Sequence, residues 1–126
     1  MITILIEKSN PTTVFAAEEL KKYLRMLMPK AGDIAITCDS TAEKVFRLGL
    51  MTDFGLDMSD AEDPALDDIV YINTTAEGGV IAGSNPIALL IAVYRYLRLC
   101  GCRWLFPGVD GEYIPLIEAL PAVTYR

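Results

Sequence analysis

GSNPIALLIAVYRYLRLCGCRWLFPGVDGEYIP, residues 83–115, is the stretch that decides the fold. Ser84 or Asn85 is a suitable N-cap, because its side-chain oxygen can accept a hydrogen bond from the first helical turn. Pro86 suits the first helical position, where the missing N–H costs no hydrogen bond. The pattern therefore predicts a helix that begins at residue 85 or 86, followed by an aromatic strand and a turn.

Apolar residues occupy nearly every position of this predicted helix. Its charged side chains, Arg95 and Arg98, lie near the C-terminal end, where the helix dipole favours cations. Gly101 suits the left-handed conformation that commonly follows a helix end. A helix that is apolar around its circumference must be covered on nearly every side. We therefore expect a core helix from Asn85 to about Cys100, with almost complete burial of Leu90, Val93 and Leu97.

Hydrophobic periodicity assigns the other elements. An amphipathic helix is expected between Asn10 and Pro29, because apolar residues recur at helical spacing from Ala16 to Leu27. Short apolar or alternating runs predict strands at residues 2–6, 34–38, 45–50, 69–73, 79–82, 102–106 and 122–125. Two helices separated by a run of strands indicate the α+β class, so we expect a mixed sheet of about four or five strands with both helices packed on one face.

Length and composition limit the class of protein. The chain has 126 residues, of which 52% are apolar, so we expect a single folded domain over residues 1–126. Its net charge of −6 disfavours nucleic acids and anionic membranes as partners. Histidine is absent, so the commonest general base and metal ligand is missing. No signal peptide is visible and the most apolar window is too short to span a bilayer, so we expect a cytoplasmic protein.

Neither the cysteines nor the acidic residues form a recognisable metal motif. Cys38, Cys100 and Cys102 are odd in number and lack a CxxC pair, so we favour buried, reduced thiols. A bridge from Cys38 to one of the other two is the alternative. Residues 52–68 hold seven carboxylates and no basic residue. Their spacing is not that of an EF-hand, so we expect an exposed, mobile loop rather than a calcium site.

Four residues are candidates for ligand or interface contacts: Arg103, Trp104, Glu112 and Tyr113. Aromatic and charged side chains at a strand end could form the wall of a sugar site. The structural alternative is that Trp104 is core, Arg103 pairs with Glu112, and Tyr113 covers an edge, and it is favoured because large aromatic residues are mostly packing residues.

The segment Gly78–Asn85 has the glycine spacing of a P-loop but a serine in place of its lysine, so no cofactor is expected. No catalytic residue or metal ligand is assigned.

A family pattern runs through the same stretch. It consists of a strand that ends in Gly, an Asn-Pro helix start, a small-residue-rich helix with a Tyr, and then an L-G-C-R-W segment before a Pro-Gly turn. The matching residues are Gly83, Asn85, Pro86, Tyr94, Leu97, Gly101, Arg103, Trp104, Pro107 and Gly108. The earlier segment AAEELKKYLRML matches as well. On these residues the chain resembles the N-terminal domain of α-glucuronidases and related glycoside hydrolases. It is also similar to the small domain before the barrel in bacterial β-N-acetylhexosaminidases.

The resemblance implies a zincin-like fold without a metal centre and a non-catalytic, accessory role in carbohydrate metabolism. In those families the chemistry lies in a following (β/α)₈ barrel, so the barrel would be the partner of this domain. The alternative is a carbohydrate-binding or protein-interaction module acting through the Trp104–Tyr113 edge. A small enzyme that uses carboxylates is disfavoured by the absence of histidine. If the domain supports a barrel, we expect an apolar surface on the sheet face opposite the helices or at the Trp104–Tyr113 edge, covered by self-association when the domain is isolated.

Overall fold

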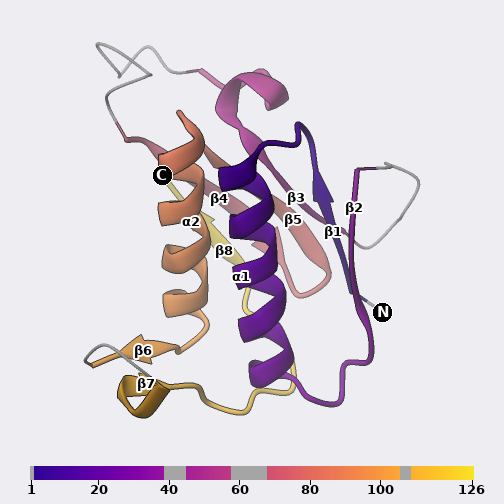
Figure 1. Cartoon of the computed structure of the whole chain (residues 1–126), viewed down its shortest axis with the longest axis vertical. Coiled ribbons are helices and arrows are strands. Elements are labelled where there is room, and N and C mark those ends of the chain that lie inside the picture. Colours follow the sequence, from indigo (N-terminus) through magenta and orange to yellow (C-terminus); the bar gives the residue numbers. More distant parts are fainter. Residues whose placement is uncertain (1, 39–44, 58–67, 106–108) are drawn as a thin grey trace.

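The computed structural model describes residues 2–38, 45–57, 68–105 and 109–126 (Figure 1). In this part of the chain there are two α-helices, α1 (Pro11–Leu27) and α2 (Pro86–Leu99), and two short 3₁₀ helices, η1 (Met51–Phe54) and η2 (Val109–Gly111). The strands are β1 (Ile2–Ile6), β2 (Ile34–Thr37), β3 (Val45–Leu50), β4 (Val70–Thr75), β5 (Gly78–Gly83), β6 (Arg103–Trp104), β7 (Glu112–Tyr113) and β8 (Val123–Tyr125).

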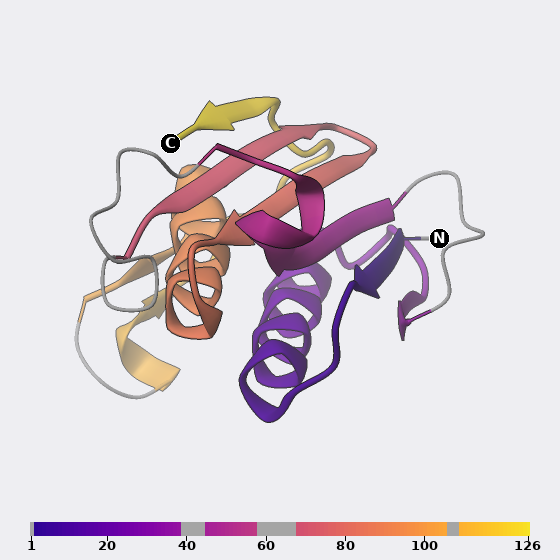
Figure 2. The same ribbon diagram turned by 90° about the horizontal axis from the view of Figure 1, so that it is seen from above.

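The described strands form a mixed sheet of six, in the order β2-β1-β3-β5-β4-β8. The first four of these are parallel to one another, and β4 is antiparallel to both β5 and β8. Both helices cover the same face of the sheet (Figure 2). The α+β class is therefore confirmed, with slightly more strands than expected. β6 and β7 form a separate two-stranded sheet.

Both helices begin as the sequence predicts. Asn10 and Asn85 have extended backbones, and their side chains accept hydrogen bonds from the N–H groups of Thr13 at 2.9 Å and Ala88 at 2.8 Å. A proline follows each cap at the first helical position, where its fixed φ suits the helix. Gly101 has φ of 110° just beyond α2, so the predicted positive φ at this residue is confirmed. Both helices lie on one side of the sheet and run in the same direction (Figure 1).

The core lies between the sheet and the helix layer. Alternate strand residues point towards the helices because successive side chains of a strand lie on opposite faces. The large residues that meet there are Ile4, Ile6, Phe46, Leu48, Ile72 and Ile81 from the sheet, and Leu20, Leu24, Leu89, Val93 and Leu97 from the helices. The apolar positions predicted for the first helix are thus all in the core or next to it.

The expectation that α2 is covered on nearly every side is wrong. Val93 and Leu97 are fully buried, but Leu90 is only half-buried. Ile87 is 62% exposed and Ile91 39% exposed. The reason is the layer arrangement: α2 has the sheet below it and α1 beside it, and its outer face has no further layer in the described part of the chain (Figure 2).

The acidic segment predicted as a loop is described only at its ends, and residues 58–67 lie outside the described residues. At its start, the Asp53 carboxylate accepts a hydrogen bond from the Leu50 N–H at 2.9 Å and pairs with Lys8 at 3.1 Å. At its end, the Asp68 carboxylate accepts from the Asn85 side chain at 3.0 Å. Among the described residues, no three His, Cys, Asp or Glu side chains gather closely enough to hold a metal ion.

Candidate docking surface

The four candidate residues of the sequence lie together on the β6–β7 hairpin, at one end of the helix layer (Figure 1). Arg103 is paired with Tyr113 across the hairpin, and Trp104 with Glu112. Directly opposite residues of an antiparallel pair share a face. One face of the hairpin therefore carries Trp104 and Glu112, and the other carries Arg103 and Tyr113.

The Trp104 face is fastened to both helices. The Trp104 ring meets Tyr23 of α1 and Tyr94 of α2 edge to face, with centroid distances of 5.3 Å and 5.7 Å. The Trp104 indole N–H donates to the Tyr23 hydroxyl at 3.3 Å, and that hydroxyl donates to the Glu112 carboxylate at 2.7 Å. Trp104 is half-buried in these contacts, so it acts as a packing residue that anchors the hairpin.

The tyrosines of this cluster are kept as neutral donors. Burial raises the pKa of Tyr23, and the hydrogen bond to Glu112 raises it further. Burial also raises the pKa of Tyr94, whose hydroxyl donates to the Glu19 carboxylate at 3.0 Å. Both carboxylates therefore serve as acceptors within the fold. The sequence did not single out Glu19, Tyr23 or Tyr94 for these bonds, because only the packing of the two helices brings them together.

The predicted Arg103–Glu112 pair is wrong. The Arg103 guanidinium donates to the backbone oxygens of Arg98 at 2.8 Å and Cys102 at 2.7 Å. Glu112 instead accepts from Tyr23, on the other face of the hairpin. Arg103 thus serves the end of α2, where the last carbonyl groups lack helical partners and a cation is favourable.

The outer face of the hairpin is open. Tyr113 is 58% exposed beside the exposed Arg103, and Leu105, the next residue after β6, is 75% exposed. Tyr113 was expected to cover an edge, but most of the Tyr113 ring is accessible. These residues form one exposed site on the outer face of the hairpin.

A second apolar surface lies on the outer face of the helix layer, and we call Phe15, Ile87 and Ile91 the helix patch. Ile87 and Ile91 are one turn apart on α2, so they share a face. The Glu19–Tyr94 hydrogen bond shows which turns of α1 and α2 lie side by side. One turn before this bond, α1 carries Phe15, which is 47% exposed, and α2 carries half-buried Leu90 next to Ile91. The exposed apolar side chains of the patch therefore come from both helices.

The sheet face opposite the helices is less apolar than the face that the helices cover. The expectation of an exposed apolar surface on this opposite face is therefore wrong. Strand alternation puts Arg47 and Asn73 on that face, and the Arg47 guanidinium pairs with Glu7 at 3.2 Å. The exposed large apolar residues of the described chain lie elsewhere. They are Phe15, Met26, Ile87, Ile91, Leu99, Leu105, Tyr113 and Leu116. The other expected place, the Trp104–Tyr113 edge, does carry exposed apolar side chains.

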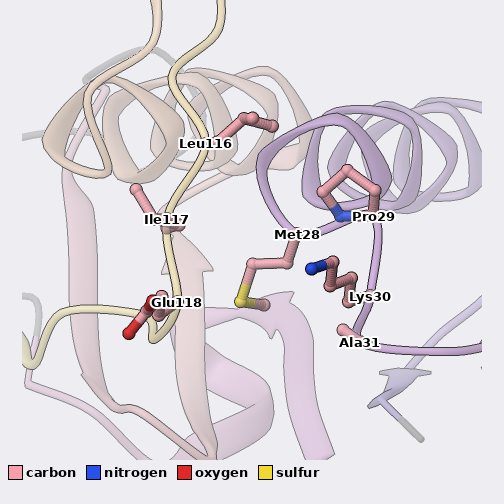
Figure 3. A pocket seen from close by; sticks show the side chains of 7 residues that line it. All are labelled: Met28, Pro29, Lys30, Ala31, Leu116, Ile117 and Glu118. Atoms are coloured by element: carbon pink, nitrogen blue, oxygen red, sulfur yellow. The ribbon is translucent and has the colours of Figure 1, made fainter.

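A shallow groove of about 500 Å³ lies between the end of α1 and the extended segment before β8 (Figure 3). Its lining is Met28, Pro29, Lys30, Ala31, Leu116, Ile117 and Glu118. The Ile117 N–H donates to the Leu27 backbone oxygen at 2.9 Å, which ties the two walls together. The lining contains one carboxylate, Glu118, whereas glycoside hydrolysis uses a pair. The groove is thus an apolar depression without the groups for that chemistry.

All three cysteines are free. Cys100 and Cys102 are buried at the end of α2, while Cys38 is exposed after β2. The alternative of a Cys38 bridge is therefore wrong for this structure, and the prediction of buried thiols holds for two of the three. Burial raises the pKa of Cys100 to about 12 and that of Cys102 to about 11.

We expect one fast-reacting thiol per native chain at pH 8. Only a thiolate attacks a chromogenic disulfide reagent, and the raised pKa values keep Cys100 and Cys102 protonated as well as covered. The measurement is a thiol titration with and without denaturant, which should release the two slow groups. Cys38→Ser is the control and should abolish the fast phase. Fast reaction of two or three thiols in the native protein would contradict the burial of this helix end.

The described structure defines an open-faced α+β domain with one apolar helix layer. No helix in residues 2–38, 45–57, 68–105 or 109–126 is long and apolar enough to cross a membrane. Neither a scan against protein-family models nor a search of curated proteins finds a match for this chain.

Proposed function

We propose that the chain is a non-catalytic N-terminal accessory domain of a glycoside hydrolase, and that it packs against a (β/α)₈ catalytic barrel. The motif residues from Gly83 to Gly108 suggest the family. A sheet with two helices is the architecture that the resemblance implies. The observation that carries the docking role is the helix patch, because exposed apolar side chains that gather across two elements are typical of an interaction surface.

The helix patch is suited to a protein partner rather than to a small ligand. Phe15, Ile87 and Ile91 protrude from neighbouring helices, and none of them lines the described groove (Figure 3). Lys22 of α1 and Arg98 of α2 are exposed about two turns beyond Phe15 and Ile91 in the same helix layer. An apolar centre with a charged rim is the usual composition of a protein interface. We expect the isolated domain to self-associate through this patch, rather than through the two surfaces that the sequence indicates.

The placement of the carboxylates supports a non-catalytic role. Glycosidases hold two carboxyl groups on opposite sides of one sugar, about 5 to 10 Å apart. Glu112 and Glu19 are the two in the aromatic cluster, and each accepts a hydrogen bond from a tyrosine. The described groove is lined by neither of them. A barrel, in contrast, gathers side chains from eight loops around a pocket.

A second candidate function is a carbohydrate-binding or protein-interaction module that acts through the outer face of the β6–β7 hairpin. The exposure of Tyr113 favours it, because an accessible aromatic ring can pack against a sugar. Trp104 does not support it, since its ring is engaged by Tyr23 and Tyr94.

We also propose a cytoplasmic location, which suits three free thiols in one small domain.

The isolated chain is expected to hydrolyse neither aryl glucuronides nor aryl N-acetylglucosaminides. The reason is that no described pocket presents two carboxylates. Release of the chromogenic aryl group at high protein concentration is the measurement, with Glu112→Gln prepared in parallel. Turnover by the native chain that Glu112→Gln abolishes would overturn the accessory-domain proposal. Residual turnover that is equal in both proteins would identify a contaminating enzyme.

A further inference from the structure

We draw no further inference here: the strongest candidate, the apolar surface patch that Phe15 of α1 forms with Ile87 and Ile91 of α2 on the outer face of the helix layer, belongs to the docking surface already described, and nothing in the structure shows a second occupant for it.

Discussion

Replacing Gly83 by alanine is expected to destabilise the domain by at least about 3 kcal/mol, at the upper end of the range for overpacking. Gly83 is the last residue of β5 and lies directly under the first turn of α2. A Cβ atom there would lie 2.2 Å from the Leu89 backbone nitrogen and 2.5 Å from the Ala88 carbonyl carbon. Backbone atoms cannot rotate away as a side chain does, so the whole helix would have to lift from the sheet.

The measurement is urea unfolding followed by circular dichroism. Gly55→Ala is the matched control, because Gly55 has φ of 65° with no atom within 4 Å of an added Cβ. It should cost only about 1 kcal/mol, the usual penalty of a left-handed conformation for alanine. A Gly83→Ala midpoint within error of the wild-type value would contradict the close approach of α2 and β5.

Leu89→Ala is expected to cost about 2–5 kcal/mol, the range for deletion of a fully buried leucine side chain. Leu89 is 0% exposed and lies in the core cluster beneath α2. The substitution removes apolar contacts and leaves a cavity that the packed sheet cannot fill. Urea unfolding of the wild-type and variant chains gives the change in unfolding free energy.

Ile91→Ala on the same helix is the control for Leu89→Ala. Ile91 is 39% exposed in the helix patch, so its truncation should cost clearly less than that of Leu89. Leu90→Ala should fall between the two because Leu90 is half-buried. Equal losses for Leu89→Ala and Ile91→Ala would mean that the outer face of α2 is as deeply packed as the inner face, which would remove the helix patch.

Local sequence signals were sufficient to predict the ends of the helices and the strands β4 and β5. The Asn10-Pro11 and Asn85-Pro86 starts depend on side-chain hydrogen bonds that reach only three residues along the chain. The positive φ of Gly101 likewise depends only on the helix end directly before it. The strands predicted at residues 69–73 and 79–82 are β4 and β5, and the short polar turn Ala76-Glu77 joins them as an antiparallel pair. Each of these features is decided within a few residues, so the sequence reveals it.

The strand order could not be predicted in the same way. β3 pairs with both β1 and β5, and β8 joins the far edge of β4, across long separations in the chain. Hydrophobic runs show that a strand is covered, but they do not name its neighbours. The strand predicted at residues 122–125 is β8, but its apolar run does not show that it pairs with β4 and so joins the sheet, which is why the sheet is larger than expected.

Two expectations, one about the candidate site and one about the burial of α2, are wrong for physical reasons. The Arg103–Glu112 pair was inferred from opposite charges, but the register places Glu112 opposite Trp104, on the face that meets Tyr23. The apolar circumference of α2 was interpreted as complete burial within the chain. Apolar side chains such as Ile87 can equally mark a surface that another molecule covers, and sequence alone does not separate the two cases.

The central claim, that the helix patch docks on a following barrel, is tested most directly by hydroxyl-radical footprinting. Oxidation rates of Phe15, Ile87 and Ile91 would be compared between the chain of residues 1–126, at a concentration at which it is monomeric, and the full product of its reading frame. We expect a longer product in which these three side chains are protected, while Tyr71, on the opposite face of the sheet, reacts equally in both proteins. A reading frame that ends at Arg126, or equal oxidation of the helix patch in both proteins, would contradict it.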